Sequence, residues 1–190
     1  MNDKNTISRS PKLMSADDTA LLVVDVQEKL IAVMDGPEKI VFNVGRLVEG
    51  ATLLGLPVAA TEQYPKGLGP TVGELADKLG DVPAKVTFSC TGCPEIFEDL
   101  VARGMRKLLV CGIEAHVCVQ QTVLDMISAG WQVYVAVDAV GSRNELDYRT
   151  SLGRMEAAGA VLTTTEAALF EWCESAENEK FKEISRLVRS

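Results

Sequence analysis

Strand-like and helix-like segments alternate along almost the whole chain, and this alternation restricts its fold more than any other feature. Residues 19–26 (TALLVVDV) form a nearly continuous apolar run, typical of a strand buried on both faces. Pro37 to Leu54 carries apolar residues at a period of about 3.6, typical of an amphipathic helix. Regular alternation predicts βαβ units with right-handed crossovers. We therefore expect an α/β fold, a three-layer α/β/α sandwich with a doubly wound, Rossmann-like parallel sheet of about six strands.

The remaining segments continue the alternation within one domain. Residues 27–34 begin a helix or turn, and residues 62–71 form a Gly/Pro-rich loop. Further strands are predicted at residues 57–61, 84–88, 107–112, 132–137 and 160–163. Further helices are predicted at residues 94–103, 117–129, 144–158 and 166–173. We expect a single domain over residues 1–190, with a flexible arm at residues 1–15 and a terminal helix within residues 175–190.

Composition and charge argue against several classes of function. A chain of 190 residues can bury one sizeable core, and its net charge of −8 argues against nucleic acid or an anionic membrane as partner. No apolar run approaches the roughly 20 residues of a membrane span. The first 15 residues lack the apolar centre of a secretory signal. Five cysteines without a secreted framework indicate reduced thiols and a cytoplasmic location.

The segment Lys107 to Met126 (KLLVCGIEAHVCVQQTVLDM) contains a candidate nucleophile. Its apolar strand-like run breaks at Gly112, and Cys118 follows where a helix is predicted to begin. Reactive groups of α/β folds gather at the carboxyl ends of parallel strands. Unpaired N–H groups and the macrodipole at a helix N-terminus also favour a thiolate. Local physics therefore makes Cys118 the first candidate for chemistry.

Two charged residues at other predicted strand ends are candidate partners for this thiol. Asp25 interrupts an apolar run, where a carboxylate is costly unless it is paired, although it could simply cap the next turn. Lys85 lies among apolar residues, although a single lysine there is commonly a surface residue. As a set with Cys118, however, they can form one charge-coupled cluster. Asp25 would act as general base, Lys85 would hold the charges, and N–H groups after Gly112 would stabilise an oxyanion.

Three motifs in this order resemble those of the isochorismatase-like cysteine hydrolases, the superfamily that includes nicotinamidase and N-carbamoylsarcosine amidohydrolase. They are LLVVDVQ with Asp25, KVTFS with Lys85, and CGIEAHVCVQQT with Cys118. The likeness extends from Thr19 to Val188. The segments TEQYPKGLGPT and FKEISRLV look most similar to the metal-free isochorismatase domain-containing group, whose functions are largely unassigned.

This resemblance implies specific roles for several residues. It implies an Asp25–Lys85–Cys118 triad, a cis peptide between Ile113 and Glu114, and an oxyanion hole built from the N–H groups of Glu114 and Cys118. It also implies that no cofactor is needed and that the chain forms a homo-oligomer, a dimer or larger. Nicotinamidases carry an Asp/His metal site after the second strand, whereas this chain has a single histidine, His116, so no metal is expected.

The expected function is cysteine-dependent hydrolysis of a small amide or related acyl compound through a thioester. Isochorismatases split a vinyl ether and do not need the cysteine, so Cys118 favours an acyl substrate. The alternative is a non-catalytic module that binds a small molecule or a protein. Residues predicted to line the substrate pocket are Gln27, Gln63, Tyr64, Phe88 and His116. Cys90 and Cys93 form a CxxC pair, and a redox-active protein is therefore a third interpretation.

Overall fold

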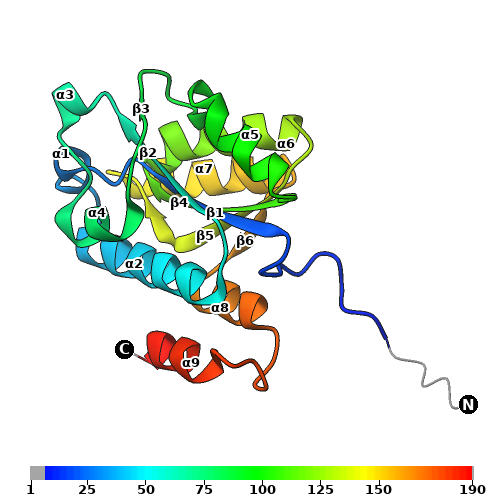
Figure 1. Cartoon of the computed structure of the whole chain (residues 1–190). Coiled ribbons are helices and arrows are strands. Elements are labelled where there is room, and N and C mark those ends of the chain that lie inside the picture. The colour runs from blue at the N-terminus through cyan, green and yellow to red at the C-terminus, as the bar shows by residue number, and fades with distance from the viewer. Residues whose placement is uncertain (1–6, 190) are drawn as a thin grey trace, which may run out of the picture.

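A six-stranded, all-parallel sheet forms the centre of the computed structural model, which describes residues 7–189 (Figure 1). The strand order is β3-β2-β1-β4-β5-β6, the order of a doubly wound Rossmann-like sheet, so the predicted fold class is confirmed. The strands are β1 (Thr19–Val24), β2 (Val58–Gln63), β3 (Ala84–Lys85), β4 (Lys107–Ile113), β5 (Gln132–Gly141) and β6 (Val161–Thr163).

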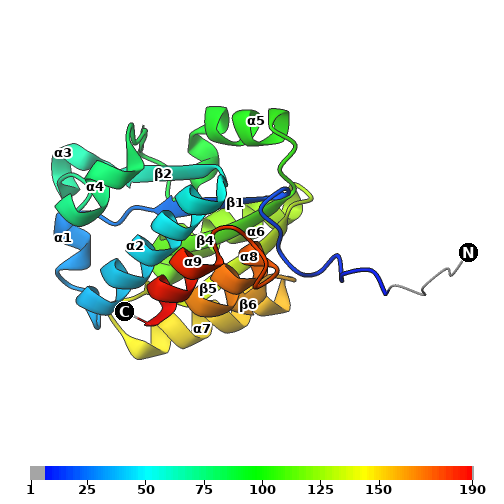
Figure 2. The same cartoon turned by 60° about the horizontal axis from the view of Figure 1, so that its bottom comes forward.

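Helices cover both faces of this sheet and make the three layers visible in Figures 1 and 2. One face is covered by α2 (Pro37–Leu54), α4 (Gly73–Leu79), α8 (Thr165–Cys173) and α9 (Phe181–Arg189). The other face is covered by α5 (Pro94–Ala102), α6 (Gln120–Ser128) and α7 (Glu145–Ala157). Shorter elements are α1 (Glu28–Ile31), α3 (Pro65–Leu68), a 3-10 turn (Cys90–Gly92) and a π-helix (Ala115–Val119). No helix within residues 7–189 is long and apolar enough to span a bilayer.

Alternate side chains of β1 enter two separate hydrophobic clusters. Leu21 and Val23 belong to the cluster under α2 and α8, whereas Leu22 and Val24 belong to the cluster under α5 and α6. Because strand side chains alternate between faces, a strand between two helical layers must be apolar throughout. This is the physical basis of the apolar run at residues 19–26.

Several boundaries differ from those predicted. Helix α2 has the predicted limits, but α4 lies in a segment for which no helix was predicted. Strand β5 continues to Gly141, four residues beyond the predicted end, and β2 extends to Gln63 into the predicted loop. These extensions are stabilised by ladder hydrogen bonds with neighbouring strands, which residue pattern alone does not reveal.

Part of the predicted N-terminal arm packs against the body of the protein. Arg9 donates hydrogen bonds to the carbonyls of Met14 and Glu171 at 2.8 and 2.7 Å. The Lys107 ammonium bonds the Leu13 carbonyl at 2.6 Å, and Met14 is fully buried. Residues 9–14 are therefore held in place, while residues 1–6 of the predicted arm lie outside the described residues.

The topology brings the carboxyl ends of β1 and β4 together at the point where the strand order reverses. Such switch points leave a crevice in which α/β proteins bind ligands. Here Gly112 pairs with Val24 and has a φ of 109°, which L side chains rarely adopt. A Cβ at Gly112 would lie 2.1 Å from the Val24 carbonyl oxygen, so only glycine permits this approach.

Replacing Gly112 by alanine should therefore lower the free energy of unfolding by at least about 2 kcal/mol, because the new methyl group meets backbone at an unfavourable φ. Gly153→Ala is the matched control, since Gly153 lies in α7 with open space around it. This control should be neutral or slightly stabilising. Urea unfolding midpoints measure both, and equal midpoints for Gly112→Ala and wild type would contradict the close approach.

Candidate active site

A fully buried ion pair between Asp25 and Lys85 lies at the carboxyl ends of β1 and β3. Lys85 Nζ is 2.7 Å from Asp25 Oδ2, and neither side chain is exposed to solvent. Asp25 directly follows β1 and has a φ of 50°, in the left-handed region that non-glycine residues seldom occupy. Its N–H bonds the Thr61 carbonyl at 3.1 Å, which holds this conformation. Unusual backbone geometry at a buried charge is a common mark of a functional site.

The Lys85 ammonium is surrounded by hydrogen-bond acceptors. Besides Asp25, it donates to Gln63 Oε1 at 2.8 Å and to the Phe88 carbonyl at 2.9 Å. The Thr87 carbonyl lies at 3.3 Å. An ammonium group has three donors and no acceptor, so these oxygens satisfy all of its hydrogen-bonding capacity.

The Asp25 carboxyl group interacts with two further side chains. Its Oδ1 accepts a hydrogen bond from Thr61 Oγ1 at 2.8 Å, and Cys118 lies close enough for its thiol and the carboxyl group to affect each other's pKa. Burial raises the pKa of Asp25, while Lys85 and these hydrogen bonds oppose that rise. Asp25, Lys85 and Cys118 thus lie together, as the sequence predicts for a charge-coupled cluster.

Cys118 lies in the π-helix that joins β4 to α6, and only 4% of its surface is exposed. Burial is the main effect that raises its pKa, the Asp25 carboxylate raises it further, and Lys85 opposes them. The helix N-terminus therefore does not lower the pKa of this thiol, because desolvation and the carboxylate outweigh the macrodipole. The raised pKa favours the protonated thiol at neutral pH, so the thiol needs a base.

The turn before Cys118 has a cis peptide and a backbone N–H group without a protein acceptor. The peptide bond between Ile113 and Glu114 is cis, at the position that the family resemblance implies. Within residues 7–189, the Glu114 N–H has no hydrogen bond to a protein acceptor, and the Cys118 N–H has none to an acceptor outside its own helix. The Glu114 carbonyl accepts from Val117 and Val119 at 3.1 and 3.2 Å, which fixes the turn. Backbone N–H groups beside a nucleophile can stabilise an oxyanion.

The residues predicted to line the pocket have different environments. Gln27 and Gln63 are buried, and both amides are hydrogen-bonded within the protein. Tyr64 and Phe88 have about half of their surface exposed, next to buried Gln63 and Lys85. His116 Nδ1 is 2.9 Å from Ser142 Oγ, so the ring is held by β5's end rather than by the Asp25–Cys118 pair. Sequence reasoning missed Thr61, whose hydroxyl completes the Asp25 environment.

Cys90 is the second thiol close to the ion pair. Its Sγ lies 3.3 Å from Thr61 Oγ1, and the residue is completely buried. Burial, with a contribution from Asp25, raises the pKa of Cys90 to about 11. Burial also raises the pKa of Cys93, and all five cysteines are free thiols. Redox-active CxxC pairs have thiols of lowered pKa, so these values oppose the redox interpretation.

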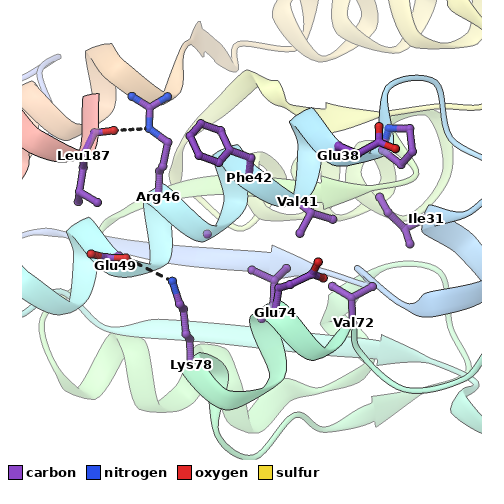
Figure 3. Close-up of a pocket in the computed structure, with 13 residues that line it drawn as sticks. Ile31, Glu38, Val41, Phe42, Arg46, Glu49, Val72, Glu74, Lys78 and Leu187 are labelled. Carbon is purple, nitrogen blue, oxygen red and sulfur yellow. Dashed lines mark hydrogen bonds and ion pairs between the residues drawn. The ribbon is translucent and has the colours of Figure 1, made fainter. Parts of the chain in front are cut away.

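Other features of the surface do not contribute to this site. Residues 7–189 contain no cluster of three or more His, Cys, Asp or Glu side chains able to hold a metal ion. A groove of about 660 Å³ lies between α2 and α4, with Leu187 of α9 also lining it (Figure 3). None of the charged or thiol side chains of the candidate site lines that groove.

The fold is a Rossmann-like α/β/α sandwich with an Asp–Lys–Cys cluster at its switch point, and sequence comparison assigns the family. The isochorismatase domain model matches residues 19–167, most of the chain, so the protein belongs to the isochorismatase family. Isochorismatase domain-containing protein 2 of Homo sapiens is 40% identical over 172 residues, which cover 90% of this chain and 83% of that protein.

Solved structures of similar proteins agree with this assignment. The Caenorhabditis elegans protein called MAR1 ribonuclease has a TM-score of 0.88 and 38% identity, over 94% of this chain and 93% of its own. The Escherichia coli YcaC product, described as an octameric hydrolase of unknown specificity, has a TM-score of 0.86 and 27% identity, with coverage of 95% and 91%. YcaC from Pseudomonas aeruginosa, described with covalent acrylamide, has a TM-score of 0.84 and 25% identity, with coverage of 96% and 98%.

Lys85→Met should destabilise the protein by about 3–5 kcal/mol near neutral pH, because the Asp25 carboxylate is then buried without its counter-charge. Adding Asp25→Asn to this variant should recover most of the loss, since no unpaired charge remains. Lys39→Met, at an exposed lysine, is the control and should stay within about 0.5 kcal/mol of wild type. Urea denaturation provides the comparison, and equal stability of the two Lys→Met variants would refute the buried pair.

Proposed function

We propose that the protein hydrolyses a small amide or related acyl compound through a thioester on Cys118. The observation that carries this proposal is the contact of the Cys118 thiol with a carboxylate that is itself buried and paired with Lys85. A thiol needs a nearby base to become a nucleophile, and Asp25 occupies that position. The bond broken would be a C–N bond outside a peptide chain.

In the first half-reaction, Cys118 Sγ attacks the substrate carbonyl carbon while its proton passes to Asp25. The carbonyl π electrons move to the oxygen, and the N–H groups of Glu114 and Cys118 bind the oxyanion. Collapse of this tetrahedral intermediate re-forms the carbonyl and breaks the C–N bond. Asp25 returns the proton to the departing amine nitrogen, which leaves an acyl thioester on the enzyme.

In the second half-reaction, water replaces the amine. Asp25 removes a proton from the water as its oxygen attacks the thioester carbonyl, and the same two N–H groups stabilise the second oxyanion. The C–S bond then breaks, the acid product leaves, and the proton from Asp25 returns to the Cys118 sulfur. Throughout, Lys85 offsets the negative charge that moves between carboxylate and sulfur, because its ammonium is fixed beside Asp25.

Two comparisons support this proposal. Acrylamide is an electrophile to which thiols add, so the covalent acrylamide described for the Pseudomonas aeruginosa relative fits a protein family that carries a reactive nucleophile. The octameric state described for the Escherichia coli relative supports a homo-oligomer here. Five free, buried thiols also fit a reducing compartment such as the cytoplasm.

Two other functions are less compatible with these observations. A module that only binds a small molecule or a protein does not require a buried base in contact with a thiol. Ribonuclease, the activity in the name of the Caenorhabditis elegans relative, requires binding a polyanion. The net charge of −8 opposes such binding, since nucleic-acid-binding surfaces are basic.

A panel of small amides, ureas and carbamoyl compounds should contain a substrate whose turnover depends on Cys118. Cys118→Ala should lower kcat by about 1,000-fold or more, because the thioester can no longer form. Cys90→Ser, which changes the neighbouring thiol, should retain most of the activity. Turnover that survives in Cys118→Ala would show that Cys118 is not the nucleophile.

Labelling with acrylamide separates an enzyme from a binding module without knowledge of the substrate. At pH 7 we expect alkylation of wild type at Cys118 well before the other thiols, and much slower alkylation of Asp25→Asn, because the base is then absent. Peptide mass spectrometry identifies the modified cysteine. Equally slow labelling of all five thiols in wild type would favour the binding module.

A further inference from the structure

We propose that Gln63 is a positioning residue for the proposed reaction. Its neutral amide holds the Lys85 ammonium by a hydrogen bond and does not compete with the Asp25 carboxylate for the positive charge of Lys85. This inference rests on the proposed function of the triad and assigns to Gln63 a role other than lining the pocket. It is carried by four hydrogen bonds that together determine how the Gln63 amide is oriented and what it offers to Lys85.

The partners of the Gln63 side chain allow only one orientation of its amide. Nε2 lies 2.9 Å from the carbonyl oxygen of Val86, and a carbonyl can only accept. Oε1 lies 2.8 Å from Lys85 Nζ, and an ammonium can only donate. Flipping the amide would therefore set donor against donor and acceptor against acceptor. Gln63 necessarily presents an uncharged acceptor to Lys85.

A second glutamine fixes the backbone of Gln63. Gln27 Oε1 accepts from the Gln63 N–H at 2.7 Å, and Gln27 Nε2 donates to the Gln63 carbonyl at 3.0 Å. The same Nε2 also donates to the Gly69 carbonyl at 2.7 Å. Gln27 is fully buried and lies two residues after Asp25, so the segment that carries the base also fixes the residue that holds the ammonium.

The absence of charge on the Gln63 side chain is therefore as important as its shape. Lys85 has one carboxylate partner, Asp25, and its other acceptors are neutral oxygens. The ionisable groups that interact within this cluster are Asp25, Lys85, Cys90, Cys93 and Cys118, and Glu95 acts on Cys93 from outside it. A carboxylate in place of the Gln63 amide would share the ammonium with Asp25 and add a negative charge beside the thiol. Both effects oppose loss of the Cys118 proton.

The test is the pH dependence of Cys118 alkylation by acrylamide in wild type, Gln63→Glu, Gln63→Met and Gln121→Glu. Gln63→Glu keeps the size of the side chain and adds charge, whereas Gln63→Met removes the acceptor without adding charge. Gln121→Glu makes the same chemical change at an exposed position of α6. Peptide mass spectrometry follows modification of Cys118, and thermal melting shows whether each variant is folded.

We expect the acid limb of the Gln63→Glu profile to move about one pH unit or more to higher pH, which is about a tenfold slower reaction at a fixed pH on that limb. Gln63→Met should react more slowly at its plateau, with no shift to higher pH, because Lys85 is less firmly held. Gln121→Glu should follow wild type.

A Gln63→Glu profile identical to that of wild type would overturn the inference, and so would identical profiles for Gln63→Glu and Gln63→Met. If Gln63→Glu does not fold, Gln63→Met decides, and a wild-type rate in that variant would overturn the inference. The rate of Cys118 alkylation in Asp25→Asn separates failure of the inference about Gln63 from failure of the proposed function. If wild-type labelling of Cys118 does not depend on Asp25, the triad is wrong whatever Gln63 does.

Discussion

The buried ion pair between Asp25 and Lys85 sets the conditions that the rest of the structure must meet. Removing two charges from water costs several kcal/mol for each ion, and their attraction offsets this cost only if the remaining hydrogen bonds are also made. Thr61, Gln63 and the Phe88 carbonyl provide them. Together with the ion pair, these groups come from the ends of three adjacent strands, β1, β2 and β3. The register that pairs Gln63 with Lys85 is therefore a requirement of the site as well as of the sheet.

The same requirement explains why the thiol arrives from the opposite half of the fold. Beyond β1 the order of the sheet reverses, and β4 ends beside Asp25 because Gly112 lets its backbone approach Val24. The turn after Gly112 then brings Cys118 to the Asp25 carboxylate. The half of the sheet formed by β1, β2 and β3 thus supplies the charged residues, and the half that begins with β4 supplies the thiol. The switch point between β1 and β4 brings them together.

The parts of this arrangement that sequence predicts are those with a strong local pattern. Helix α2 begins at Pro37 and ends before Gly55, and both residues mark helix ends. Helix α4 was missed because it buries only Leu75, too little for a visible period. The role of Gln63 could not be predicted either, since an amide in a polar loop gains its partners only when β2 and β3 pair. Burial of Cys118, and with it the direction of its pKa shift, likewise follows from packing.

The raised pKa of Cys118 means that the site must supply a base for the thiol. Desolvation raises the pKa of both Cys118 and Asp25, which keeps the proton on sulfur at rest and makes the carboxylate a stronger base. Because each group acts on the pKa of the other, the two titrate as a coupled pair rather than as separate residues. A thiol that loses its proton only as it attacks is protected from side reactions in the resting state. In the proposed reaction, Lys85 makes the transfer feasible, because its ammonium stabilises negative charge on either partner, and the neutrality of Gln63 keeps the positive charge of Lys85 available to them.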